Sequence, residues 1–201
     1  MEEDQTQNFR RKKRRKRRLQ GAVLYIAIAI GLAWFFESQA TTTIIFVRHA
    51  EKDLSVKDDP ELTEDGQRRA FELTRQMKDA DVVAGIDAIY STPFKRNVAT
   101  VEPLSKLLEL PINLYDKNDY KSVLETILDN HKGKIILVVG HSDTLANLMA
   151  ELGASKSVPT IADNEYDNIY IVSIPWFGKT KTIRLRYGAP YDPDGKVRAI
   201  K

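Results

Sequence analysis

Two histidines in this sequence directly follow short apolar segments. Arg48 and His49 come after the run at residues 44–47, and His141 comes after the run at 135–140. Short apolar runs without alternation are typical of strands buried on both faces of a sheet. Residues that follow such strands lie at the carboxyl edge of an open parallel sheet, where ligand sites form. The two imidazoles are therefore candidate site residues.

A third apolar segment, 86–91, is followed by Thr92 and, one helical turn later, by Arg96. If these three strands are parallel, two imidazoles and two guanidiniums meet at one edge of the sheet. Four groups that can all be cationic repel one another unless an anion lies among them, and phosphate suits guanidinium forks best. The hydroxyl groups of Thr92 and Ser142, with backbone N–H groups at the following helix starts, would add donors. The sequence predicts a phosphate site.

The elements that must position these residues alternate between strand and helix. We expect a three-layer α/β/α sandwich with a mostly parallel sheet, in which the last strand is antiparallel and near an edge. Thr63 is expected to cap one helix and Thr92, followed by Pro93, to cap the next. The strands are expected at 43–48, 86–91, 112–115, 134–140, 168–174 and 182–188.

The first forty residues differ in composition from the rest. Residues 10–18 are nine consecutive cations, and residues 19–36 carry no charge. At about 1.5 Å per residue, eighteen helical positions reach about 27 Å, enough to cross a bilayer core. We therefore expect three regions: a basic cytoplasmic tail at 1–18, a transmembrane signal-anchor helix at 19–36, and a folded domain at 43–201. The positive-inside rule would make this domain periplasmic or extracellular.

Two other interpretations of the N-terminus stay open. The small residues at 38–40 also suit a signal peptidase, so the segment is alternatively a cleaved signal peptide. A basic tail that binds nucleic acid would leave the adjoining apolar run unexplained. From residue 41 onward, 22 Lys and Arg stand against 24 Asp and Glu. The domain thus has no basic bias, and we expect a membrane partner but no nucleic acid.

Four segments of the sequence resemble the histidine phosphatase superfamily, also called phosphoglycerate mutase-like. They are "VRHAEKD", "LTEDGQRRA", "IYSTPFKRNVATVEPL" and "VVGHSDTLANLM", in the order found in that family. The resemblance implies that His49 is the nucleophile, which becomes phosphohistidine, and that Arg48, Arg96 and His141 hold the phosphate. It also implies that no metal and no cofactor are needed. The absence of cysteine independently excludes thiolate catalysis and Cys-ligated metals.

The sequence departs from the family in two places. Ala50 stands where the family usually has Gly, which we expect to narrow the approach of the backbone to phosphate. The general acid is also ambiguous: Asp119 is the first candidate, Asp116 the second, and Glu125 is expected to face solvent. Further candidates, Asp163 and Glu165, lie in a polar loop that could fold over the site. Without an acid, phosphohistidine or aryl phosphates would be favoured substrates.

The short loops around the site indicate an open pocket. A mutase must cover a bisphosphate intermediate, so we expect a phosphatase acting on a phosphorylated small molecule or phosphoprotein. A phosphoglycerate mutase-like phosphotransferase stays an alternative. Another is a binding protein that keeps the phosphate pocket but has lost turnover.

Overall fold

The computed structural model describes residues 2–38, 41–78, 80, 85–154 and 160–193. The chain divides into two compact units, Met1–Ala40 and Thr41–Lys201. Residues 39 and 40 of the alternative cleavage site lie outside the described residues.

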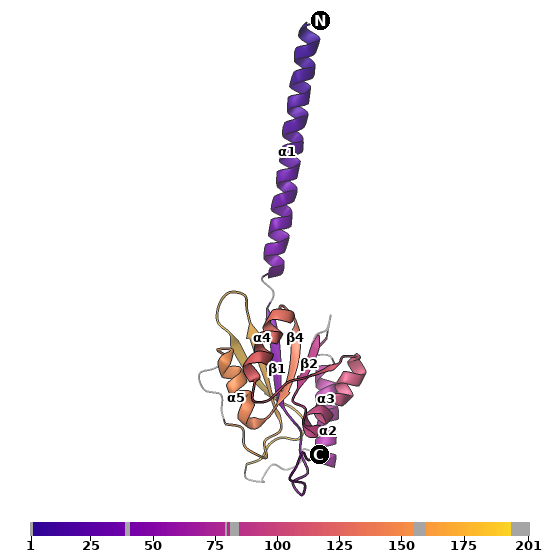
Figure 1. The fold of residues 1–201 in the computed structure, drawn as a ribbon, viewed down its shortest axis with the longest axis vertical. Helices are drawn as coiled ribbons and strands as arrows, with labels where there is room; N and C mark the ends of the chain where they lie inside the picture. Colours follow the sequence, from indigo (N-terminus) through magenta and orange to yellow (C-terminus); the bar gives the residue numbers. More distant parts are fainter. Residues whose placement is uncertain (1, 39–40, 79, 81–84, 155–159, 194–201) are drawn as a thin grey trace. The chain divides into compact units, whose positions relative to one another are not determined.

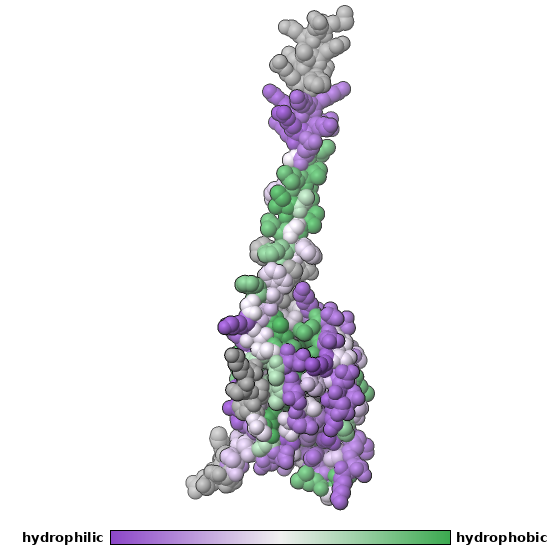
Figure 2. All heavy atoms as spheres, turned by 60° about the vertical axis from the view of Figure 1, so that its left-hand side comes forward, coloured by the Kyte–Doolittle hydropathy of each residue, from purple (hydrophilic) through white to green (hydrophobic). Residues whose placement is uncertain are grey.

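The first unit is one helix, α1 (Glu2–Ser38). Its described side chains change from hydrophilic cations to an apolar segment, seen as a purple band followed by green in Figure 2. The part Lys12–Phe35 contains an 18-residue window with a mean hydropathy of 1.6 and is a candidate membrane span. By length and composition, this helix is suited to be a membrane span or a signal sequence.

The second unit contains a six-stranded mixed sheet with the order β3-β2-β4-β1-β5-β6 (Figure 1). Strands β1 to β4 are parallel, whereas β5 runs antiparallel to β1 and β6 antiparallel to β5. The expectation of a mostly parallel sheet with an antiparallel edge strand is confirmed. The strands are β1 (Thr42–Arg48), β2 (Ala88–Ser91), β3 (Ile112–Leu114), β4 (Ile135–Gly140), β5 (Asn168–Ile174) and β6 (Lys181–Arg186).

Helices cover both faces of the sheet, so the expected three-layer sandwich is confirmed. Two hydrophobic clusters separate the layers, and β1 contributes alternately to both, Ile44 and Phe46 to one and Ile45 and Val47 to the other. This two-sided burial explains the continuous apolar run of β1. Helices α2 (Glu64–Met77) and α3 (Lys95–Leu108) pack on one face, and α4 (Tyr120–Asn130) and α5 (Ser142–Glu151) on the other.

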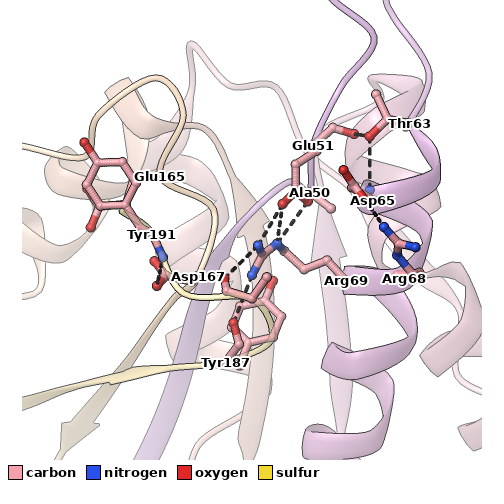
Figure 3. Close-up of polar contacts among 12 residues, drawn as sticks. Ala50, Glu51, Thr63, Asp65, Arg68, Arg69, Glu165, Asp167, Tyr187 and Tyr191 are labelled. Atoms are coloured by element: carbon pink, nitrogen blue, oxygen red, sulfur yellow. Dashed lines mark hydrogen bonds and ion pairs between the residues drawn. The ribbon is translucent and has the colours of Figure 1, made fainter. Parts of the chain in front are cut away.

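Helix α2 is fixed against the segment that follows β1. Thr63 caps it as expected, because its hydroxyl group accepts a hydrogen bond from the Gly66 N–H at 3.1 Å. A side chain at Gly66 would clash, since an added Cβ would lie 2.2 Å from the Glu51 carbonyl oxygen. The buried Arg69 then donates to both Glu51 carboxylate oxygens and to the Tyr187 carbonyl (Figure 3). These contacts join the segment after β1, helix α2 and the chain after β6.

Candidate active site

The sheet register brings the predicted residues to one edge. Arg48 pairs with Gly140 across β1 and β4, so His49 and His141 are the next residues of adjacent parallel strands. The His49 N–H donates to the Gly140 carbonyl at 3.1 Å, and the two imidazole ring centres lie 5.5 Å apart. Ser91 pairs with Val139, which places Thr92 at the same edge.

The hydrogen bond at His49 fixes its tautomer. Its Nδ1 lies 2.8 Å from the Ala50 carbonyl oxygen, which can only accept, so Nδ1 carries the proton. Nε2 is then left with a lone pair. The side chain is 2% exposed, and burial lowers its pKa to about 3, helped by the charges of Arg48 and Arg96 and opposed by the bond to Ala50. Near neutral pH, His49 therefore presents an unprotonated nitrogen, as a nucleophile must.

His141 is neutral at the same pH. Burial lowers its pKa to about 4, with Arg96 as the largest charge contribution in the same direction. Its Nε2 lies 3.0 Å from Thr92 Oγ1. Thr92 was expected to cap the next helix; instead Phe94 occupies the cap position of α3, and the Thr92 hydroxyl group faces the imidazole. Thr92 therefore orients His141.

Arg48 is held by the loop before β5. Its Nη1 donates to the Ala162 carbonyl at 2.6 Å and to the Glu165 carbonyl at 3.1 Å. The Tyr166 ring lies 4.4 Å from the guanidinium carbon, a cation–π distance. The polar loop expected to fold over the site thus contacts it through backbone oxygens. Arg48 Nε is buried and has no hydrogen-bond partner in the described part of the chain.

Arg96 resembles Arg48 in its surroundings. Its guanidinium carbon lies 4.6 Å from the Phe94 ring centre, and its Nε is likewise buried without a partner among the described residues. One carboxylate is near, since Asp59 Oδ1 lies 3.8 Å from Nη1. Thr100 connects Arg96 to the His49 loop, because its hydroxyl group donates to the Arg96 carbonyl and accepts from the Ala50 N–H. Two buried guanidinium N–H groups without partners suit an arriving anion.

The remaining predicted residues lie in different positions. Ser142 is the first residue of α5, beside His141. Asp119 caps α4, where its carboxylate accepts from the Ser122 N–H, and Asp116 accepts from the Asn118 N–H. The methyl group of Ala50 is fully buried in a small cluster with Leu62 and Ala70. The expected narrowing at the phosphate is therefore wrong, because this methyl group packs under α2.

The structure brings forward another carboxylate that sequence reasoning missed. Asp143, in the first turn of α5, is near enough to influence the pKa values of Arg48, Arg96 and His141. Its signal in the sequence was its position two residues after His141. Glu165 is buried and engaged by Asn168 Nδ2 and Arg186, which argues against a role in proton transfer.

Two aromatic rings were also missed. Phe94 lies edge-on to His141, with ring centres 5.2 Å apart, and Tyr166 lies 5.9 Å from His49. Each ring also lies against one of the two site arginines. Neither ring has a spacing in the sequence that marks it, because the two come from loops 72 positions apart that only folding brings together.

A hollow of about 790 Å³ lies elsewhere on the domain. Apolar and charged side chains of α2, α3 and the preceding loops line it, and none of the four predicted phosphate-site residues is among them. Its lining includes Leu62, Phe71, Lys95, Glu102 and Lys106. None of the described residues that line it is a histidine or an arginine.

Comparisons with known proteins concern the family and the fold. Residues 44–117 match the histidine phosphatase superfamily (branch 1). A probable phosphatase of Schizosaccharomyces pombe is 30% identical over 87 residues, which are 40% of this chain and only 29% of that protein. The chain therefore spans less than a third of that curated relative.

Solved structures support the fold. The protein histidine phosphatase SixA, solved with tungstate, has a TM-score of 0.57 at 20% identity, covering 72% of this chain and 96% of SixA. A putative phosphohistidine phosphatase SixA from Nakamurella multipartitia gives 0.56 at 17% identity, covering 75% and 98%. A mycobacterial glucosyl-3-phosphoglycerate phosphatase gives 0.54 at 14% identity, covering 66% and 90%.

Proposed function

We propose that the chain is a member of the histidine phosphatase superfamily and a membrane-tethered phosphatase that works through a phosphohistidine on His49. The observation that carries this proposal is that a nucleophilic group and anion-binding groups lie together at one end of the sheet. An imidazole with a lone pair on Nε2 lies beside two arginines whose buried Nε groups have no partner among the described residues. Nucleophile and anion-binding groups are both required for phosphoryl transfer.

In the first step, the His49 Nε2 lone pair attacks phosphorus and the bond to the leaving group breaks. The leaving oxygen or nitrogen takes a proton from a carboxylic acid or from water. The guanidiniums of Arg48 and Arg96 stabilise the charge on the phosphoryl oxygens through bidentate donors. In the second step, water attacks the phosphorus atom and gives a proton to the carboxylate or to solvent. The P–N bond breaks, its electron pair returns to Nε2, and phosphate leaves.

His141 has a conditional role in this scheme. Its pKa of about 4 leaves it neutral before substrate arrives, and a dianionic phosphoryl group would favour its protonated form. Protonated His141 can then donate from Nε2 to a phosphoryl oxygen in exchange for its present contact with Thr92 Oγ1. Binding of phosphate should therefore be accompanied by proton uptake.

The flanking rings point to a class of substrate. Phe94 and Tyr166 give the site two aromatic edges next to the positions where phosphate would bind. Flat leaving groups pack well against such rings. We favour aryl phosphates and phosphohistidine side chains, which also leave with little help from an acid. Asp119 as general acid stays a prediction, and Asp143 is the competing candidate.

The experiment is hydrolysis of p-nitrophenyl phosphate by the full-length protein in detergent, with His49→Ala as the control. Turnover by the wild type that the variant lacks supports the enzyme. An acid-labile, alkali-stable phosphoprotein, trapped from labelled substrate and absent in His49→Ala, would identify the intermediate. The ion pair of Arg96 with Asp59 favours one rival, a phosphate-binding protein without turnover. Phosphate binding with no hydrolysis of any phosphate ester or phosphoramidate would establish that rival.

The membrane part of the proposal rests on the candidate span and the cations before it. A reporter fused at the C-terminus tests it. Reporter activity outside the cytoplasm supports a periplasmic or extracellular catalytic domain, and cytoplasmic activity refutes it.

A further inference from the structure

The loop between β5 and β6 lies at the end of the sheet where β1 starts, whereas the candidate active site lies at the end where β1 finishes. Thr42, the first residue of β1, pairs with Ile174, the last of β5, and Lys181 begins β6. The loop 175–180 is thus at the end of the sheet where β1 starts, as Figure 1 shows. Arg48, at the other end of β1, leads into the site. The two surfaces are separated by the length of β1, about 20 Å at about 3.3 Å per residue.

This loop exposes two large aromatic side chains. Trp176 is 51% exposed and Phe177 is 85% exposed, with ring centres 6.3 Å apart. Aromatic residues that project together from a hairpin are costly in water, whereas they suit the interface between lipid headgroups and acyl chains. Lys179 and Lys181 follow within five residues, and both are exposed.

More lysines occupy the same edge. The Thr43 N–H donates to the Lys134 carbonyl, which places Lys134 at the end of the sheet where β1 starts. Lys132 lies two residues earlier in the chain. Lys132 and Lys134 are exposed, and Lys134 forms an ion pair with Asp87. Cations beside exposed aromatics match an anionic lipid surface, because the lysines contact headgroups while the rings enter the interface.

Chain length keeps this edge near a bilayer that α1 crosses. The candidate span ends at Phe35 and β1 begins at Thr42. The six residues between them reach at most about 25 Å from Phe35 to Thr42 when fully extended. A linker of this length allows the end of the sheet where β1 starts to reach the headgroups.

We propose that this edge, formed by Trp176, Phe177, Lys179, Lys181 and the lysines before β4, docks on the surface of an anionic lipid bilayer. The inference rests on the proposed membrane tether and adds an orientation to it. With this edge on the lipid, the phosphate pocket opens about 20 Å above the headgroups. The substrate is then a soluble phosphorylated molecule or protein and not a phosphorylated lipid within the bilayer.

The test uses the full chain in lipid nanodiscs and reads Trp176 itself. The protein has two tryptophans, so Trp34→Phe leaves Trp176 as the sole indole. Lipids brominated near the acyl carbonyl should quench roughly half of its fluorescence, as expected for an indole at headgroup level. The control is the triple variant Trp34→Phe, Trp176→Phe, Phe71→Trp. It places the reporter at another exposed aromatic position, on α2, where no quenching is expected.

The outcomes separate the docking from the tether. A chain that migrates with the nanodiscs, but whose Trp176 is quenched no more than the control, refutes the docking and leaves the tether intact. A chain that does not migrate with nanodiscs overturns both. Quenching should be stronger in anionic than in zwitterionic lipid, and Lys179→Glu with Lys181→Glu should remove that difference. Equal quenching in both lipids would refute the part assigned to the lysines.

Discussion

Lowering the pH from about 7.5 to about 5 should destabilise the catalytic domain through its two buried imidazoles. In an unfolded chain both have an ordinary histidine pKa of about 6.5. In the folded domain the pKa of His49 is lowered to about 3 and that of His141 to about 4. Between these values the unfolded state binds more protons, so stability is complete above about pH 6.5 and is lost as the pH falls.

The size of the effect follows from those pKa values. At about pH 5 the proton binds each histidine far better in the unfolded state than in the folded state. The ratio of the proton-binding polynomials, 1 + 10^(pKa − pH), of the unfolded and folded states corresponds to about 2 kcal/mol per histidine in favour of the unfolded state. Together His49 and His141 give about 4 kcal/mol, a large share of a typical domain stability of about 5–15 kcal/mol. Carboxylates contribute little in this window, because their ordinary pKa values are about 4.

The assay is urea unfolding of fragment 41–201, which contains the whole sheet and both large hydrophobic clusters. The buffers contain no phosphate, because a bound anion would change both pKa values. His49→Asn and His141→Asn keep a polar group without the titration. Each variant is compared only with itself at the two pH values, so the constant cost of the substitution cancels. The pH-dependent loss should fall by about 2 kcal/mol in each single variant and nearly vanish in the double variant. If the double variant loses as much stability as the wild type, the imidazoles are not buried in the neutral form.

Three further predictions concern turnover. Arg96→Ala should reduce kcat for p-nitrophenyl phosphate by about 10²–10³-fold, because it removes donors to the transition state. Arg96→Lys should restore only part of kcat, since the bidentate guanidinium fork is lost. A kcat of Arg96→Ala within about threefold of wild type would remove Arg96 from the site. If Asp143 protonates the leaving group, Asp143→Asn should lower kcat about 10²-fold or more with an alkyl phosphate but little with p-nitrophenyl phosphate. Asp119→Asn should mainly lower the melting temperature, because it weakens the α4 cap. The reverse result would restore Asp119 as the acid. Tyr166→Ala should raise KM for aryl phosphates more than for alkyl phosphates by about tenfold, and an equal change for both would refute aryl selection by this ring.

Most of the fold could be predicted from local pattern. The apolar runs of β1 and β4 are buried on both faces, and such runs reveal central parallel strands without any tertiary information. Thr63 was identifiable because an N-cap depends on residues within one turn. The position of Thr92 could not be predicted in the same way. Its hydroxyl group contacts His141, 49 positions along the chain, instead of capping α3.

The sequence by itself determined which groups gather at the site, because parallel strands end at one edge and the four imidazoles and guanidiniums lie at or within five residues of those strand ends. Only the tertiary structure decided the state of those groups. The proton on His49 Nδ1, the two arginine Nε atoms without a partner among the described residues, and the rings of Phe94 and Tyr166 depend on burial and on contacts between distant loops. Desolvation is a property of the packed surroundings and has no period in the sequence, so the lowered pKa that suits His49 to the proposed nucleophilic attack appears only after folding.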